Sequence, residues 1–188
     1  MQLDTWTQGE WVGRFGADGY VLSSFSNASA GTAPDVASLP AYIASFRSSG
    51  RSATSWISPN PNADARALQA PAGGSGRAIG CWFSGYSDFV DVWMDAAAEA
   101  AGKWYQLAAY AVDYDNGDPT HDGFLPRRQT VELLNMHTLE AAAPTLYLDS
   151  YVGGTWIVWQ LNTSARVRFS QLQGDNNVLS AIMFDPVA

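Results

Sequence analysis

A run of oxygen-bearing side chains in the middle of the chain has the composition of a calcium-binding loop. Asp113, Asp115, Asn116 and Asp118 lie close together, and Gly117 between them permits a sharp turn. Closely spaced carboxylates and an amide carbonyl are the hard oxygen ligands that Ca²⁺ prefers. The run does not match an EF-hand loop, because no glutamate follows the glycine at the required spacing. No cofactor is required on this interpretation, and a calcium ion at these four residues would be structural.

A solvated turn is the alternative interpretation of the same run. Asp113 or Asp115 would then pair with one of the two arginines that follow, Arg127 and Arg128. Arg127 also has a possible ligand-binding role, because an arginine can clamp an anionic sugar through paired hydrogen bonds. The sequence leaves these alternatives open.

Aromatic side chains are the strongest indication of a binding function. The chain contains 8 Trp, 8 Tyr and 8 Phe. Flat sugar faces stack on such rings, while neighbouring polar groups supply directional hydrogen bonds. Most of these rings must build the core, but Tyr86, Tyr151 and Trp156 each lie beside Gly or Ser at a predicted strand edge, and we expect them at a binding surface. Trp156 and Trp159 are three residues apart, so a regular strand turns them to opposite faces.

No arrangement of nucleophiles or acid–base groups predicts an enzyme. The 2 histidines, His121 and His137, lie in no metal-binding or nucleophile motif. Cys81 follows an apolar run beside Trp82, which is typical of a buried small hydrophobe. The glutamates show no pattern that suggests a glycosidase pair, whose separation in space decides the mechanism. We therefore expect a non-catalytic protein.

Composition excludes several classes of protein. The 188 residues carry 10 Lys+Arg against 18 Asp+Glu, a net charge of −8, so phosphate backbones and anionic membrane surfaces are disfavoured partners. The 1 cysteine permits no internal disulfide. No apolar run reaches the length of a membrane span, and no secretion signal stands at the N-terminus. We expect a protein at the outside of a cell or on the surface of a particle such as a virion.

The pattern that must position these side chains is one of short strands separated by turn residues. Several segments alternate apolar with polar residues, which is the period of a half-buried strand. Such segments in one chain indicate an all-β, two-sheet antiparallel sandwich or jelly roll, here one domain over residues 1–188. The predicted strands are 20–22, 53–57, 78–83, 88–94, 104–112, 129–134, 155–161, 166–169 and 178–184.

Two segments do not fit the strand pattern. Residues 35–42 indicate either a helical turn or a short irregular strand, because Pro40 interrupts both. Residues 95–102 are rich in alanine and end at Gly102, which predicts a brief helix with a glycine stop.

Four glycines near the N-terminus, Gly9, Gly13, Gly16 and Gly19, recur within eleven residues. Glycine allows positive φ and close approach of the backbone. A phosphate-cradling loop would need a preceding strand, a following helix and commonly a lysine, and none is indicated. We expect a structural role for these glycines, with Trp11, Phe15 and Tyr20 closing an end of the sandwich.

The segment that contains these glycines, Gly-Glu-Trp-Val-Gly-Arg-Phe-Gly-Ala-Asp-Gly-Tyr, resembles the G-x-W-x-G-x-Y-G-x-D-G-Y opening of a bacterial β-sandwich domain often appended to secreted polysaccharide-degrading enzymes. The resemblance implies a galactose-binding-like jelly roll of the carbohydrate-binding-module type. Phe15 departs from the usual Tyr, and segments 95–102 and 116–125 look enlarged. Further landmarks follow in the expected order over nearly the whole chain, at 55–56, 66–69, 78–82, 110–115, 128–132, 156–159 and 178–184.

Three hypotheses about function follow. The first is a non-catalytic glycan-binding module, whose partner is a polysaccharide or surface glycan. The second is a structural component of a larger assembly, such as a phage capsid decoration or tail protein, with copies of itself or other subunits as neighbours. The third, a polysaccharide lyase or hydrolase, has no visible constellation of catalytic residues to support it.

Overall fold

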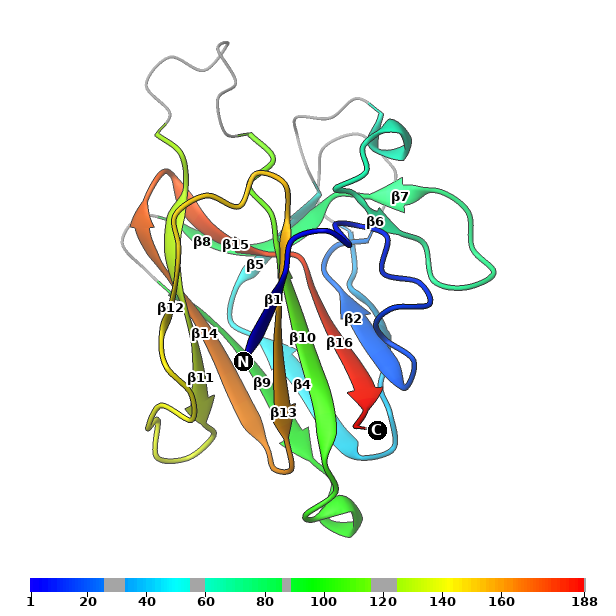
Figure 1. Cartoon of the computed structure of the whole chain (residues 1–188), viewed down its shortest axis with the longest axis vertical. Helices are drawn as coiled ribbons and strands as arrows, with labels where there is room; N and C mark the ends of the chain where they lie inside the picture. The colour runs from blue at the N-terminus through cyan, green and yellow to red at the C-terminus, as the bar shows by residue number, and fades with distance from the viewer. Residues whose placement is uncertain (26–32, 55–59, 86–88, 116–124, 188) are drawn as a thin grey trace.

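The chain folds as an antiparallel β-sandwich (Figure 1). A computed structural model describes residues 1–25, 33–54, 60–85, 89–115 and 125–187. Strands account for 52% of the chain and helices for 3%, which confirms the predicted all-β class. The described helices are two 3₁₀ turns, η1 (Pro61–Ala63) and η2 (Ala98–Ala100).

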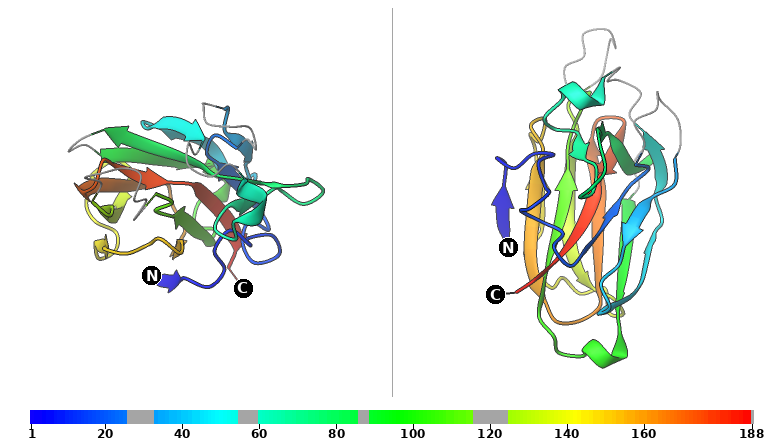
Figure 2. Two further views of the ribbon diagram at one scale, coloured as in Figure 1. Left: turned by 90° about the horizontal axis from the view of Figure 1, so that it is seen from above. Right: turned by 90° about the vertical axis from the view of Figure 1, so that its right-hand side faces the viewer.

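Two large sheets form the layers of the sandwich, which Figure 2 shows edge-on. The six-stranded sheet contains, in spatial order, β1 (Gln2–Asp4), β13 (Thr155–Leu161), β10 (Tyr105–Ala111), β16 (Ala181–Pro186), β2 (Gly19–Leu22) and β3 (Val36–Ser38). The five-stranded sheet contains β12 (Leu146–Leu148), β11 (Arg128–Asn135), β14 (Ala165–Gln173), β9 (Phe89–Ala96) and β4 (Ile43–Ser48).

Two smaller sheets complete the described strands. The three-stranded sheet contains β15 (Asn176–Leu179), β8 (Gly80–Gly85) and β5 (Arg51–Thr54), and the two-stranded hairpin contains β6 (Leu68–Gln69) and β7 (Arg77–Ala78). The predicted strand 178–184 is thus two strands in different sheets. The strand is interrupted at Ser180, whose N–H donates to the carbonyl of Tyr110 at 2.8 Å. The pairing of β15 with β8 therefore ends at Leu179.

The segments that resisted prediction are now assigned. Residues 36–38 form β3, so the strand alternative is correct for 35–42, and Pro40 lies just beyond it. The predicted brief helix within 95–102 is only the 3₁₀ turn η2, because β9 extends to Ala96. Gly102 follows the turn with φ of +79°, as the glycine stop required. Residues 55–57 of another predicted strand lie outside the described residues.

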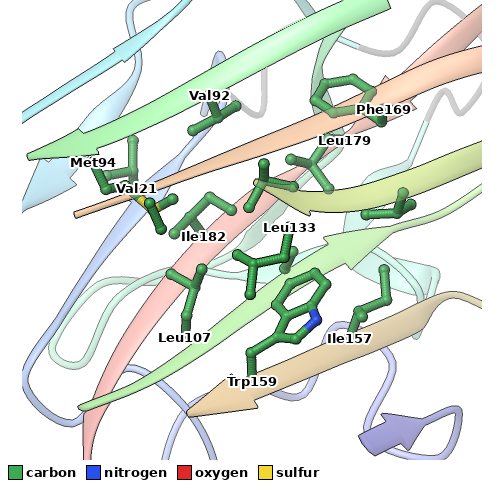
Figure 3. Close-up of a cluster of buried hydrophobic side chains, with 14 of the residues drawn as sticks. Val21, Val92, Met94, Leu107, Leu133, Ile157, Trp159, Phe169, Leu179 and Ile182 are labelled. Carbon is green, nitrogen blue, oxygen red and sulfur yellow. The ribbon is translucent and has the colours of Figure 1, made fainter. Parts of the chain in front are cut away.

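The main core lies between the two large sheets, and Figure 3 shows part of it. Leu107, Ile157 and Ile182 of the six-stranded sheet face Val92 and Leu133 of the five-stranded sheet, and all five are buried. Alternate residues of each strand point inward, as the period of two requires. This single apolar cluster joins the two layers.

A second apolar cluster covers the outer face of the six-stranded sheet. Tyr110, Trp156 and Met183 point outward from that sheet, and Trp11 and Leu68 from two other segments pack on them. The N-terminal loop and the hairpin β6–β7 therefore lie over this face as a third partial layer. Trp11, Phe15 and Tyr20 cover a sheet face rather than an end of the sandwich, which corrects the sequence expectation.

Candidate functional site

The aromatic residues predicted to bind ligand are not on the surface where the structure describes them. Tyr151 is 2% exposed, and its hydroxyl donates to Gln129 Oε1 at 3.0 Å. Trp156 is 0% exposed, and its Nε1 donates to the carbonyl of Gln8 at 2.7 Å. The prediction of exposed rings at these two positions is wrong, because residues 8–15 cover Trp156 on β13 from outside and Tyr151 belongs to the core between the two sheets. Tyr86 lies outside the described residues.

Trp156 and Trp159 do face opposite sides of β13, as their spacing predicted. Trp159 belongs to the core between the sheets, and Trp156 belongs to the outer cluster. The Trp156 ring stacks on Tyr110 with centroids 4.6 Å apart and lies 4.7 Å from the Phe15 ring. Both tryptophans are buried, so β13 is covered on both faces.

Arg127 is also buried rather than available to a sugar. Its guanidinium donates to Asp113 Oδ1 at 2.6 Å, to Asp115 Oδ2 at 2.8 Å and to Asn176 Oδ1 at 2.8 Å. Its backbone N–H also donates to Asp113 Oδ2 at 3.0 Å. The predicted pairing of these aspartates with Arg127 is confirmed, whereas Arg128 pairs with Asp149.

Of the four predicted calcium ligands, two are occupied by Arg127 and two are not described. Both carboxylate oxygens of Asp113 accept hydrogen bonds from Arg127, and Asp115 shares the same guanidinium. Asn116 and Asp118 lie outside the described residues. Over the described ranges, no three His, Cys, Asp or Glu side chains gather in a way that could hold a metal ion.

The glycines of the N-terminal segment explain how this loop follows the sheet so closely. A Cβ on Gly9 would collide with the carbonyl oxygen of Ala67, and one on Gly19 with that of Ser38. Gly13 and Gly16 adopt φ of +80° and +74°, which L side chains rarely do. The structural role predicted for these glycines is confirmed.

Gln69 of the hairpin β6–β7 holds the N-terminal loop in place. Its backbone N–H donates to the Gly9 carbonyl at 3.1 Å, and its own carbonyl accepts Trp11 Nε1 at 2.9 Å. Its side chain accepts the Val12 N–H at 3.3 Å and donates to Glu10 Oε2 at 2.9 Å. Two segments about 60 residues apart in the chain are thereby fixed side by side.

A groove lies between this loop and the loop that closes the hairpin, at the upper right of Figure 1. It consists of two adjoining hollows of about 680 and 310 Å³ that share Val12 and Ala72. We call the larger hollow the shelf; it is lined by Val12, Asn62 and residues 69–77. We call the smaller one the slot; it is lined by residues 11–17, Tyr20 and Ala72.

Polar side chains converge on the shelf. Arg77 forms an ion pair with Glu10, donates to the Ala67 carbonyl at 2.8 Å, and its backbone N–H donates to Asn62 Oδ1 at 2.7 Å. These contacts hold the polar side chains of the shelf in fixed positions, and the Glu10 carboxylate balances the charge of Arg77. A concave site of this kind, with apolar walls and a few convergent polar groups, is typical of ligand binding.

The described residues of the groove lack the side chains most often used in acid–base catalysis. Within the part of the chain that the structure describes, the lining contains no histidine, cysteine, aspartate or glutamate. Cys81 lies outside it and is half-buried rather than fully buried as predicted, but burial of its thiol raises the pKa to about 11, although the charge of Arg127 opposes the shift. The geometry of the groove can bind a ligand, but it gives no support to general acid–base catalysis.

Trp93, on the outer face of the five-stranded sheet, is not available as a surface on which a sugar could stack. Arg47 of β4 and Arg166 of β14 are its cross-strand neighbours on either side. Their guanidinium carbons lie 4.9 and 5.0 Å from the Trp93 ring centroid. Cation–π pairs of this kind stabilise the sheet surface, and they cover the ring that a sugar would need.

Sequence reasoning did not find the groove. Residues 71–76 are rich in proline and glycine, which is typical of a surface loop, and Asn62 and Arg77 lie in no periodic pattern. The available signal was the glycine-rich N-terminal segment, because close approach of its backbone was predicted and the segment forms one wall of the groove.

Comparison with known proteins adds no family to these observations. No protein-family model matches the chain, and no curated protein is significantly similar to it.

Of the helical turns in the described ranges, none has the length and apolar character needed to cross a membrane.

Proposed function

We propose that this protein is a non-catalytic glycan-binding β-sandwich and that the groove between the N-terminal loop and the hairpin β6–β7 holds the sugar. The observation that carries the proposal is the convergence of Asn62, Gln69 and Arg77 on a shelf beside the aromatic slot. Sugars present hydroxyl groups to polar side chains and C–H faces to rings, so both surfaces are used.

The resemblance of the N-terminal segment to galactose-binding-like carbohydrate-binding domains supports the same proposal. That segment forms one wall of the groove, from Trp11 to Ala17. A glycan-binding role further fits a protein on the outside of a cell or particle. The net charge of −8 makes neutral glycans the first ligands to test.

The experiment is calorimetric titration with a panel of tetrasaccharides built from glucose, galactose, mannose, xylose and N-acetylglucosamine, each with and without calcium. Arg77→Gln removes the charge on the shelf, and a lost charge-assisted hydrogen bond weakens binding by about tenfold or more. Arg128→Gln is the matched control, because Arg128 lies on the five-stranded sheet and is paired with Asp149.

Two results would contradict the proposal. One is that no member of the panel binds at millimolar concentration. The other is that Arg77→Gln, with an unchanged circular dichroism spectrum, binds a panel member as well as Arg128→Gln does. Binding that is weakened in Arg77→Gln alone supports it.

A structural component of a larger assembly is the second candidate, and the N-terminal strand favours it. Leu3 is 46% exposed in the edge strand β1, and Trp6 just beyond it is 89% exposed. Asp4 Oδ1 accepts the Trp6 N–H at 2.8 Å, so this indole is displayed on an ordered turn. Exposed apolar groups at a sheet edge are typical of association surfaces.

The mass of the protein in solution, measured by light scattering, tests this second candidate. A closed oligomer that dissociates in the Trp6→Ser variant supports assembly through this edge. A monomer of 20.2 kDa at all concentrations would contradict it.

A further inference from the structure

The two hollows of the groove differ in polarity, and this difference indicates which class of sugar they would bind. The inference rests on the glycan-binding role proposed above. The slot and the shelf meet at Val12 and Ala72, so one ligand can extend from one into the other.

The slot is mainly apolar because three aromatic rings line it and the indole N–H among them is used elsewhere; Arg14 and Tyr20 are its lining residues with other polar side-chain atoms. The Trp11 and Tyr20 ring centroids lie 5.3 Å apart, and Phe15 packs on Trp156. The single polar atom of the Trp11 side chain, Nε1, donates to the Gln69 carbonyl. The rings of Trp11, Phe15 and Tyr20 therefore line the slot mainly with carbon.

Four of the backbone donors around the slot are also occupied. The N–H groups of Arg14 and Phe15 both donate to the Trp11 carbonyl at 2.9 Å. The Val12 N–H donates to Gln69 Oε1, and the Ala17 N–H donates to Asp185 Oδ1 at 2.7 Å. A hydroxyl group that entered the slot would lose water and find none of these four donors free, which is unfavourable. A methyl group would instead lower its free energy on entering the slot, because its contact with water is unfavourable.

The shelf has the opposite character. Among the described residues, no partner accepts from the amide nitrogen of Asn62, whose oxygen is bound to the Arg77 N–H. Ser75 and Arg77 also line the shelf. Hydroxyl and amide groups of a sugar can therefore be satisfied there.

We propose that the groove selects N-acetylated amino sugars, with the acetyl methyl group in the slot and the amide and ring hydroxyls on the shelf. An acetamido group combines a methyl with an amide on a few atoms, which matches the close junction of the two hollows at Ala72. The slot, at about 310 Å³, has room for such a group.

The test compares chitotetraose with cellotetraose, which share their linkage and differ in an acetamido group in place of a hydroxyl on each ring. One methyl-sized group in an apolar pocket discriminates by about 10- to 200-fold, so we expect chitotetraose to bind at least about tenfold tighter. Saturation-transfer NMR should show the strongest transfer at the acetyl methyl protons.

Ala72→Leu fills the junction of slot and shelf. Ala72 is exposed in the hairpin loop, so the larger side chain is compatible with folding. We expect this variant to lose the preference for chitotetraose while it retains the binding of cellotetraose. Ala44→Leu, at an exposed position of β4, is the matched control and should keep the wild-type preference.

The outcomes separate this inference from the proposed function. Equal binding of the two sugars, tighter binding of cellotetraose, or a preference that survives Ala72→Leu overturns the inference alone. The inference is also overturned if chitotetraose does not bind while another sugar of the panel binds and its affinity falls in Arg77→Gln. The glycan-binding role stands in that case. Failure of the whole panel to bind overturns both.

Discussion

At the scale of single residues, the two tryptophans of β13 differ in one hydrogen bond. Trp156 Nε1 donates to the Gln8 carbonyl at 2.7 Å, whereas Trp159 Nε1 is buried with no partner among the described residues. We expect Trp156→Phe to lower the free energy of unfolding by about 1–3 kcal/mol more than Trp159→Phe does, because it leaves a carbonyl unsatisfied. Urea denaturation of both variants measures this difference. Equal losses would show that the hydrogen bond contributes nothing.

The thiol of Cys81 gives a second test at this scale. Burial raises its pKa to about 11, so little thiolate is present at pH 8. Because the thiolate is the reactive form, we expect iodoacetamide to modify the folded protein about 100-fold more slowly than the protein unfolded in urea. Mass spectrometry over time follows the reaction. Comparable rates in the two states would mean that Cys81 lies in a more polar and accessible environment than its packing indicates.

At the scale of elements, the buried ion pair at Arg127 joins segments from three parts of the chain. Asp113 and Asp115 follow β10, Arg127 precedes β11, and Asn176 begins β15. We expect Arg127→Met to lower the free energy of unfolding by about 3–5 kcal/mol, because two buried carboxylates lose their partner. Arg128→Met should cost at most about 1 kcal/mol, since the Arg128–Asp149 pair is exposed.

A double variant makes this prediction specific. Arg127→Met combined with Asp113→Asn removes one of the uncompensated charges, so part of the lost free energy should return. Urea denaturation measures all three variants. A cost for Arg127→Met no larger than that for Arg128→Met would contradict a stabilising role for the cluster.

The same scale shows what the sequence could predict. The predicted strand 155–161 coincides with β13, because a long apolar segment bounded by turn residues is a local signal. Strand β1 has three residues, and β6 and β7 have two residues each. Strands this short carry no local pattern and are defined only by pairing with another strand. The burial of Trp156 was missed for this reason, because nothing local to it reports that distant segments cover the sheet. The burial of Tyr151 was missed because nothing local reports that its ring enters the core between the sheets.

At the scale of the whole molecule, acid should destabilise the fold through particular carboxylates. The Asp91 side chain is 1% exposed beneath Arg166 and Arg168. Burial raises the pKa of Asp91, but hydrogen bonds from Arg168 and Arg166 outweigh it, so the pKa lies below the ordinary 3.8. The pKa values of Asp4 and Asp64 are lowered in the same direction, against burial, by hydrogen bonds from Thr7 and Arg66 respectively.

A carboxylate with a lowered pKa in the folded state stabilises the fold fully above the pKa of the unfolded chain, near 3.8 for Asp91. This contribution is lost as the pH falls from about 4 through the folded pKa, because the unfolded chain then binds the proton more readily. We expect the free energy of unfolding to fall over that range. Asp91→Asn should lower it at pH 7, and the gap from the wild type should narrow in acid, since asparagine resembles the protonated acid.

Urea denaturation at pH 7, 5, 4 and 3 follows the wild type, Asp91→Asn and, as a control, Asp149→Asn on the exposed pair with Arg128. The control should keep the wild-type dependence on pH, because its pair is solvated on both sides. A gap between the wild type and Asp91→Asn that is constant from pH 7 to pH 3 would contradict the argument. It would mean that the two arginines stabilise Asp91 equally in both protonation states, and acid sensitivity would then have to arise elsewhere in the molecule.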